Sequence, residues 1–238
     1  MKIISNSDIG MVRKENQDAY WVYQADDKTC LAVVCDGMGG ARGGQQASTL
    51  AVQSVKDYVA RNGLTEKPKK LFEKIVSFCN ANVFATAKSN EDLIGMGTTL
   101  VLALICGDTV FFANIGDSRA YHITNGSIRQ ITKDHSAVQE LVDSGHITER
   151  QAKLHPNKNV ITRAIGIEEN ITFDFFEEKL QHGDIILLCT DGLSNYVDEN
   201  EIQFETSGGE FEGLTSRLID LANSRGGTDN ITVAAIQI

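Results

Sequence analysis

Proline and long apolar runs are both scarce in this chain. Only two prolines occur among its 238 residues, which excludes a collagen-like repeat and argues against a proline-rich disordered segment. The longest apolar stretch, residues 100–106, is far shorter than the roughly 20 residues that cross a bilayer as a helix. The first ten residues lack the apolar core of a secretory signal. We therefore expect a soluble, cytoplasmic protein that makes no contact with a membrane.

Cysteine and positive charge are also in short supply. The cysteines are odd in number, lie in apolar segments and show no CxxC spacing; they are Cys30, Cys35, Cys79, Cys106 and Cys189. Neither a disulfide framework nor a zinc site is indicated, and we expect reduced core residues. Lys and Arg number 22 against 32 Asp and Glu, a formal net charge of -10, which repels polyanions and argues against nucleic acid as a partner. An excess of carboxylates suits cations better.

The remaining composition is that of a globular protein with a sizeable core. Hydrophobic residues make up 42% of the chain and charged residues 23%, values typical of a folded domain. No internal repeat or low-complexity linker divides the sequence. We therefore expect one domain over residues 1–238, and we expect it to be a monomer.

Hydrophobic periodicity predicts both strands and helices. Strand-like runs cover residues 19–24, 31–35, 98–106, 109–114, 119–124, 127–131, 171–180, 184–190 and 230–238. Helical spacing covers residues 44–62, a stretch that begins near Pro68, and a late stretch that carries Leu214, Leu218 and Leu221. Short helical pieces in residues 136–166 interrupt the strands, so we predict a flap there.

Two turns indicate how the strands pair. Gly107-Asp108 and Asn125-Gly126 each separate two strand-like runs by only two residues, which is the pattern of a tight hairpin and of antiparallel pairing. The helices are grouped and do not alternate with the strands. We therefore predict an α+β fold in which helices cover antiparallel sheets, and not a doubly wound parallel sheet.

Four aspartates stand at the ends of predicted strands or beside glycines: Asp18, Asp36, Asp191 and Asp229. Apolar strands are expected to stop where a carboxylate appears, since an unpaired buried charge is costly. If these strand ends converge, like charges repel unless cations lie between them, and oxygen ligands select magnesium or manganese over zinc, with calcium a weaker alternative. Each aspartate alone could be a turn former or helix cap. The whole set, with Gly37 and Gly40 to let the backbone approach a cation, favours a metal site.

A series of motifs in a fixed order extends this interpretation over nearly the whole chain. The segments are Gly10-Met11-Val12-Arg13, Asn16-Gln17-Asp18, Asp36-Gly37-Met38-Gly39-Gly40, Gly97-Thr98-Thr99, Asn114-Ile115-Gly116-Asp117-Ser118-Arg119, Asp134-His135-Ser136, Thr190-Asp191-Gly192-Leu193 and Gly226-Gly227-Thr228-Asp229-Asn230-Ile231-Thr232. In this order they resemble the metal-dependent (type 2C) serine/threonine protein phosphatases, in particular their compact bacterial members. The resemblance implies one catalytic domain, built as two antiparallel β-sheets sandwiched between helix layers with a small flap subdomain.

The resemblance also implies a reaction. It is hydrolysis of phosphoserine and phosphothreonine in proteins by a water shared between two Mn²⁺ or Mg²⁺ ions roughly 4 Å apart. Asp36 would bridge the ions, Asp18 would lie near the second, and the Gly37 carbonyl, Asp191 and Asp229 would complete the cluster. The partners would be phosphorylated proteins and a bacterial serine/threonine kinase whose action the enzyme opposes.

Further roles follow from the same resemblance. Arg13 would bind phosphate oxygens, a role suited to a planar and always charged donor group, although a solvated surface arginine is the alternative. Asp117 and Asp191 resemble a third-metal site of bacterial members. Met38 stands where many eukaryotic relatives carry a histidine often treated as the general acid, and methionine cannot donate a proton. The proton donor to the leaving group therefore stays open.

Two other function classes compete with the enzyme. A binding module of the same fold would have lost metal ligands, whereas the four aspartates named above are all present. A metal-dependent nuclease would also use carboxylate-held cations, but the acidic balance and the lack of a basic stripe argue against it. A protein phosphatase is therefore the leading hypothesis.

Overall fold

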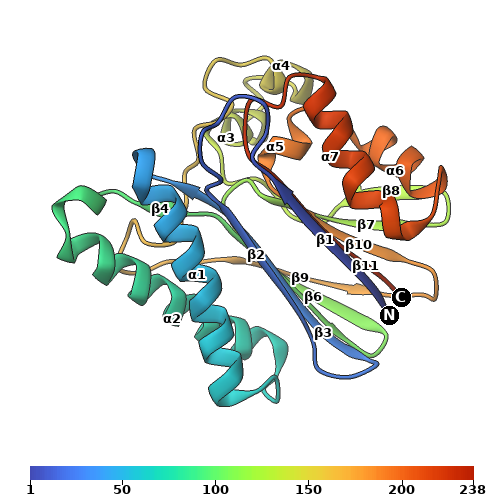
Figure 1. Cartoon of the computed structure of the whole chain (residues 1–238), viewed down its shortest axis with the longest axis horizontal. Helices are drawn as coiled ribbons and strands as arrows, with labels where there is room; N and C mark the ends of the chain where they lie inside the picture. The colour runs from blue at the N-terminus through green and yellow to red at the C-terminus, as the bar shows by residue number, and fades with distance from the viewer.

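Two antiparallel β-sheets lie face to face in the computed structural model, which describes residues 1–238 apart from the side chains at positions 41 and 42 (Figure 1). The first sheet has the strand order β1-β11-β10-β7-β8; the second has the order β2-β3-β5-β6-β9, with β4 paired to β3. Helices lie outside both sheets. The predicted α+β fold, with two antiparallel sheets between helix layers, is confirmed.

The first sheet consists of β1 (Lys2–Asp8), β7 (Arg119–Thr124), β8 (Ser127–Gln130), β10 (Ile185–Cys189) and β11 (Ile231–Gln237). The second consists of β2 (Asp18–Gln24), β3 (Thr29–Met38), β4 (Gly97–Thr98), β5 (Leu100–Cys106), β6 (Thr109–Ile115) and β9 (Asp174–Lys179). Both predicted hairpins are present, since Cys106 pairs with Thr109 and Thr124 pairs with Ser127.

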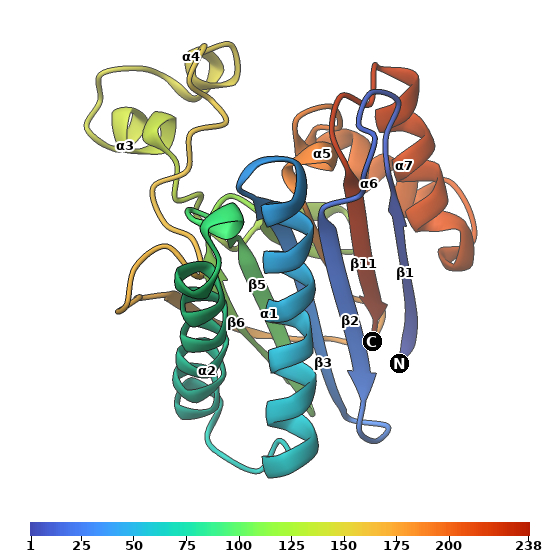
Figure 2. The same cartoon turned by 60° about the vertical axis from the view of Figure 1, so that its left-hand side comes forward.

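Helices cover the outer face of each sheet (Figure 2). The helices α1 (Gly40–Asn62) and α2 (Pro68–Ser89) pack on the second sheet, while α5 (Asp191–Ser194), α6 (Glu199–Ser207) and α7 (Leu214–Ser224) pack on the first. Short 3₁₀ turns occupy Glu91–Leu93 and Phe211–Gly213. A third apolar layer fills the space between the two sheets.

Strand β3 shows why its sequence is apolar on both faces. Leu31 and Val33 belong to the layer under α1 and α2, whereas Ala32 and Val34 belong to the layer between the sheets. Alternate residues of a strand point to opposite faces, so a strand buried on both sides has no polar face. The strand does not stop at Asp36, as the sequence led us to expect. It continues to Met38, because its last two residues pair with the short strand β4.

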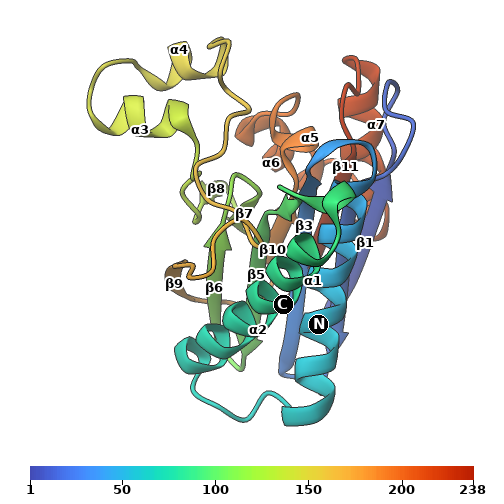
Figure 3. The ribbon, with the colours of Figure 1, turned by 90° about the vertical axis from the view of Figure 1, so that its left-hand side faces the viewer.

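The predicted flap protrudes from one end of the sandwich (Figure 3). It carries α3 (Ala137–Asp143) and α4 (Glu149–Lys153), and its base is closed by a bridge between Ser136 and Ile161. A second bridge, Thr98 to Ile165, ties the end of the flap to β4. Across the part of the chain that the structure describes, no helix is both long and apolar enough to span a bilayer.

Candidate metal centre

Asp18 and Asp36 lie directly opposite each other on the neighbouring strands β2 and β3. Asp191 is the first residue of α5 and lies two residues after the end of β10, and Asp229 lies two residues before β11. Asp18 and Asp36 therefore come from the second sheet, and Asp191 and Asp229 from the ends of strands of the first. The structure brings together the four aspartates that the sequence singled out, since the charges of Asp18, Asp191 and Asp229 all act on Asp36.

The carboxyl groups of this cluster interact with one another. Burial raises the pKa of Asp18 to about 7, and the charges of Asp191 and Asp229 act in the same direction. Burial also raises the pKa of Asp36 well above its usual value, with further contributions from Asp18 and Asp191. The pKa of Asp117, on the loop between β6 and β7, is also raised well above its usual value. Burial is the main cause, and the charge of Asp191 is the next. Burial is the largest cause of each shift and the charge of Asp191 adds to all three, so these carboxyl groups are removed from water and lie close enough to influence one another.

Asp18 and Asp191 each have one carboxylate oxygen held by hydrogen bonds and one without a partner. Asp18 Oδ2 accepts from Thr190 Oγ1 at 2.9 Å and from Thr232 Oγ1 at 2.7 Å, and Asp191 Oδ2 accepts from Asn195 Nδ2 at 3.0 Å. The other oxygen of each, Oδ1, is buried and has no hydrogen-bond partner. Buried polar atoms nearly always have a partner, so such atoms at one site point to a cation as their missing partner.

Gly37 is confined by backbone on two sides. A Cβ at this position would lie 2.0 Å from the Gly44 carbonyl oxygen and 2.6 Å from that of Gln17. A side chain at Gly44 would in turn come within 2.6 Å of the Gly37 carbonyl oxygen. Only glycine therefore fits at these two positions. The Gly37 carbonyl, a metal ligand according to the family resemblance, is held in a narrow cradle formed by the backbone of Gly44 and Gln17.

Two threonines fix the backbone of Asp36. Its N–H donates to Thr99 Oγ1 at 2.9 Å, and its carbonyl oxygen accepts from the Thr99 N–H at 2.9 Å and from Thr98 Oγ1 at 2.8 Å. Thr99 Oγ1 also shares a hydrogen bond of 2.7 Å with Ser118 Oγ, beside Asp117. Thr98 and Thr99, from the motif Gly97-Thr98-Thr99, thus support the site through a set of hydrogen bonds.

The distances between the carboxylates do not by themselves define a metal site. Among the described side chains, no three carboxylate, imidazole or thiolate groups are close enough for geometry alone to identify a metal site. The fit to divalent cations rests instead on the unpartnered oxygens of Asp18 and Asp191, and on an all-oxygen donor set that suits Mg²⁺ or Mn²⁺.

Arg13 lies beside the cluster, on the loop between β1 and β2. Its Nη2 donates to Asp229 Oδ2 at 2.7 Å, and this hydrogen bond is the main reason that the pKa of Arg13 is raised. The charges of Asp229, Asp36 and Asp191 add to the effect. The guanidinium side chain is half exposed. Arg13, which the family resemblance implies as the phosphate-binding residue, therefore lies at the mouth of the site and pairs with Asp229, a candidate metal ligand.

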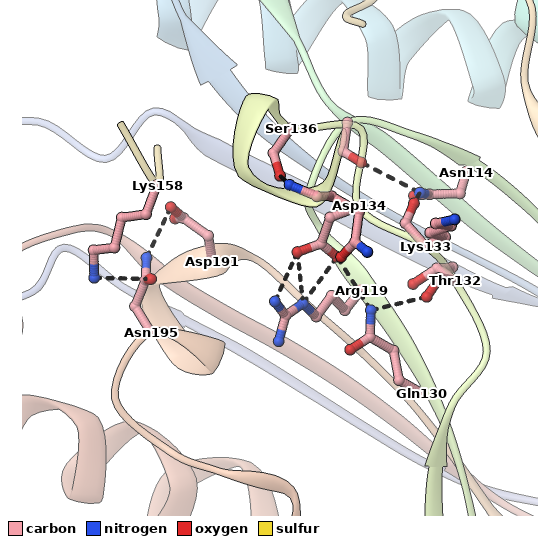
Figure 4. Close-up of polar contacts among 12 residues, drawn as sticks. Asn114, Arg119, Gln130, Thr132, Lys133, Asp134, Ser136, Lys158, Asp191 and Asn195 are labelled. Carbon is pink, nitrogen blue, oxygen red and sulfur yellow. Dashed lines mark hydrogen bonds and ion pairs between the residues drawn. The ribbon is translucent and has the colours of Figure 1, made fainter. Parts of the chain in front are cut away.

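The flap and the first sheet enclose a cavity of about 1060 Å³ next to the cluster. Asp117 and Asp191 line it, together with residues of α3, α4 and α6. Figure 4 shows that Lys158 of the flap reaches Asn195, which in turn holds Asp191; the two distances are 3.2 and 3.0 Å. The flap is thus linked by hydrogen bonds to a residue of the cluster.

A second group in this cavity is a partly buried ion pair between Arg119 and Asp134 (Figure 4). Arg119 Nη2 donates to Asp134 Oδ2 at 2.7 Å, and its Nε contacts both carboxylate oxygens. Gln130 Nε2 donates to Asp134 Oδ1 at 3.1 Å. Because Asp134 is already paired with Arg119, it differs from Asp18 and Asp191, each of which keeps one carboxylate oxygen without a hydrogen-bond partner.

Sequence reasoning gave no role to several residues that hold the cluster. Thr190 and Thr232 occur inside the motifs quoted above, next to or near the aspartates, and could have been suspected on that ground. Asn195 lies one turn of helix after Asp191, a spacing at which side chains meet.

His135 belongs to one of the motifs quoted above, Asp134-His135-Ser136. It is buried at the base of the flap, where its Nδ1 accepts from the Gly116 N–H at 3.1 Å and its Nε2 lies 3.3 Å from Asp174 Oδ2. Burial lowers its pKa. Gly116 directly precedes Asp117, so His135 supports the loop that carries this aspartate.

Comparisons with known proteins agree with this site. The family model described as "Protein phosphatase 2C" matches residues 12–230. A serine/threonine phosphatase of Listeria innocua, stp, is 39% identical over 235 residues, which cover 97% of this chain and 93% of that protein. The crystal structure of the serine/threonine phosphatase Stp1 from Staphylococcus aureus has a TM-score of 0.94 and 35% identity, covering 100% of this chain and 94% of that one.

A third relative is the catalytic domain of the phosphatase PstP, solved in complex with 2 manganese ions. It has a TM-score of 0.87 and 33% identity, and the match covers 98% of this chain and 96% of that domain. The identities exceed those at which only the fold would be shared, and the matches span nearly all of each chain. The chain therefore belongs to the protein phosphatase 2C family and is a protein serine/threonine phosphatase.

Proposed function

We propose that this phosphatase depends on divalent metal and holds two Mn²⁺ or Mg²⁺ ions with one set of oxygen ligands: Asp18, Asp36, the Gly37 carbonyl, Asp191 and Asp229. The observation that carries the proposal is the pair of buried, unpartnered oxygens, Asp18 Oδ1 and Asp191 Oδ1, in a cluster of carboxyls that repel one another. The manganese complex of PstP, a relative at 33% identity, supports the same proposal.

Bound ions of this kind lower the pKa of a coordinated water and stabilise negative charge that develops on phosphate. The protein supplies the geometry. Asp36 lies opposite Asp18 and interacts with Asp191 and Asp229, so it is the carboxylate best placed to bridge two ions. Thr98 and Thr99 fix its backbone, which holds the bridging group in place before substrate arrives.

Arg13 is proposed to bind the substrate phosphate. In the structure its guanidinium contacts Asp229, and cations held by Asp229 would compete with it for that carboxylate. The side chain is half exposed and lies at the mouth of the site, so it can turn toward an incoming phosphate. A planar guanidinium gives two parallel hydrogen bonds to such a group.

We further propose a third ion between Asp117 and Asp191. Asp117 is buried, and the charge of Asp191 raises its pKa further. Both residues line the cavity under the flap, so an ion there would lie on the substrate side of the cluster. This position is consistent with weaker and more variable binding than at the two central ions.

As a protein phosphatase the enzyme acts on phosphorylated proteins. Within that class we propose residues 1–238 as one catalytic domain and a bacterial serine/threonine kinase as the enzyme that it opposes. Met38, at the end of β3, cannot donate a proton, so the leaving alkoxide must be protonated by another group. A monomeric state, a cytoplasmic location and the absence of nucleic-acid binding stay predictions from the sequence.

The test is hydrolysis of a phosphothreonine peptide by the intact protein with Mn²⁺ and after treatment with a chelator. We expect turnover only with metal, and a loss of at least a thousandfold in Asp36→Asn. Asp27→Asn is the matched control, since this aspartate is exposed and lies in the loop between β2 and β3. Turnover that resists the chelator, or equal rates for Asp36→Asn and Asp27→Asn, would refute the metal-dependent mechanism.

A further inference from the structure

The carboxylate of Asp18 closes a ring of hydrogen bonds that begins at its own backbone. The Asp18 N–H donates to Asn16 Oδ1 at 3.1 Å, and Asn16 Nδ2 donates to Ser7 Oγ at 2.8 Å. Ser7 Oγ lies 2.7 Å from Thr232 Oγ1, which lies 2.7 Å from Asp18 Oδ2. The ring joins β1, β11 and β2, so it crosses from the edge of one sheet to the edge of the other.

With Asp18 ionised, as a metal-binding carboxylate must be, the direction of each hydrogen bond in the ring is fixed. An ionised carboxylate only accepts, so Thr232 must donate its hydroxyl proton to Asp18. Thr232 Oγ1 must then accept from Ser7, and Ser7 Oγ accepts from the amide of Asn16. The amide orientation of Asn16 is set by the same logic, because its oxygen faces the Asp18 N–H. No member can reverse its role without breaking its neighbour's hydrogen bond.

The ring decides which oxygen of Asp18 is available to a cation. Asp18 Oδ2 accepts one hydrogen bond from the Thr232 hydroxyl and one from the Thr190 hydroxyl. Thr190 Oγ1 itself accepts from the Thr232 N–H at 3.0 Å. Oδ1 is buried and receives none. A partial rotation of the carboxylate would break the hydrogen bonds to one oxygen and turn the other away from its present direction, and the ring opposes that rotation. Thr190 and Thr232 are completely buried, so water does not replace their hydrogen bonds to Asp18.

From this geometry we infer that Ser7, on an edge strand and outside the ligand set, is a positioning residue for the metal centre. It orients the Thr232 hydroxyl, and Thr232 holds the Asp18 carboxylate with Oδ1 facing the cations. Ser7 is directly opposite Thr232 in the register of β1 and β11. The pairing of these strands therefore places the Ser7 hydroxyl next to that of Thr232. The inference rests on the proposed metal dependence, and it assigns to β1 a role in metal affinity.

The test is calorimetric titration of the intact, metal-free protein with Mn²⁺. We expect Ser7→Ala to weaken Mn²⁺ binding by about threefold to tenfold, and Thr232→Val, which removes the hydroxyl next to Asp18, by about tenfold to a hundredfold. Ser7→Thr keeps a hydroxyl on a strand residue and should restore affinity to within about twofold. Ser5→Ala is the matched control, because Ser5 lies on the same strand opposite Ala234 and outside the ring.

A double-mutant cycle separates positioning from a general loss of stability. If Ser7 acts through Asp18, Ser7→Ala will cause no further loss of Mn²⁺ affinity in the Asp18→Asn background. Two results would overturn the inference about Ser7 and leave the proposed function standing. One is equal Mn²⁺ affinity of Ser7→Ala and Ser5→Ala, and the other is a full effect of Ser7→Ala in the Asp18→Asn background. Absence of Mn²⁺ binding by the unaltered protein would overturn the proposed function, and this inference with it.

Discussion

Arg13 Nη2 lies 2.7 Å from Asp229 Oδ2, so a loop near the start of the chain is joined at the candidate metal centre to the segment before its last strand. The pair is partly exposed, since the Arg13 side chain is 51% accessible. Exposed pairs contribute about 0 to 1 kcal/mol to stability. The ion pair of Arg13 with Asp229 is therefore expected to contribute little to folding, which allows the proposed role of Arg13 in phosphate binding to be tested by substitution.

Arg13→Ala is expected to lower kcat/KM for a phosphopeptide by about tenfold to a hundredfold, with most of the loss in KM, because the phosphate loses a bidentate donor. Arg13→Lys should recover only part of it, since an ammonium group lacks the planar fork. The measurement is steady-state kinetics at saturating Mn²⁺. Lys14→Ala, on the same exposed loop, is the control and should be unchanged. An Arg13→Ala enzyme with unaltered KM would argue against phosphate binding by this residue.

The pKa of Asp18 predicts how the metal-free protein responds to pH. Because the folded-state pKa is raised from 3.8 to about 7, the folded chain holds a proton that the unfolded chain has already released. Stability is therefore expected to fall as pH rises from about 4 to about 7, by on the order of 1 to 4 kcal/mol from this group. Thermal unfolding of the chelated protein between pH 5 and pH 8 measures it.

Asp18→Asn provides the comparison for that experiment. An amide cannot ionise, so the variant should be more stable than the unaltered protein at pH 8 without metal, and its pH dependence should be weaker. Mn²⁺ at pH 8 should raise the unfolding temperature of the unaltered protein more than that of the variant. A metal-free protein whose stability increased from pH 5 to pH 8 would contradict the raised pKa.

Gly37→Ala is expected to disrupt the centre through the backbone. The added Cβ would lie 2.0 Å from the Gly44 carbonyl oxygen, so either β3 or α1 must shift. The expected cost is about 3 kcal/mol or more of stability, together with loss of Mn²⁺ binding. Gly208→Ala is a milder comparison, because its Cβ would come no closer than 3.2 Å to the Phe204 carbonyl oxygen. Chemical denaturation and metal titration of both variants test this, and similar results for the two would show that the cradle around Gly37 is not needed.

Asn195→Ala removes the hydrogen bond to Asp191 Oδ2 and the link to Lys158 of the flap. We expect a loss of Mn²⁺ affinity of about tenfold, in the range found for partners of metal ligands. Asn200→Ala, an exposed residue of the same cavity, should have no effect. If the two variants bind Mn²⁺ equally well, Asn195 does not orient Asp191.

The fold and the core of the candidate site were accessible from the sequence to different degrees. Strands buried on both faces and two-residue hairpins carry strong local signals, and β3, β5, β6 and β7 were predicted within a few residues. The polar strand β1 and the polar helix α6 were missed, because neither shows a clear apolar period. Helix α1 begins four residues before the predicted start at Gly44, since its glycine-rich first turn has a low helix propensity.

The aspartates could be singled out because charged residues at the ends of buried strands conflict with the local pattern. Their hydrogen-bond partners could not be found in this way. Ser7 meets Thr232 only through the register of β1 with β11, and Thr190 meets Asp18 only through contact between the two sheets. Such pairings depend on the tertiary arrangement, which local periodicity does not encode.

The pairing of β1 with β11 has a consequence for synthesis. Strand β1 is made well before β11, the neighbour that gives it a place in the sheet, because more than two hundred residues separate the two strands. Until then neither side of its backbone is paired, and Asp18 lacks the hydroxyl of Thr232. The polar residues of β1, which made the strand hard to predict from the sequence, should also limit its aggregation before β11 is made. A polar edge is a poor template for pairing with other chains.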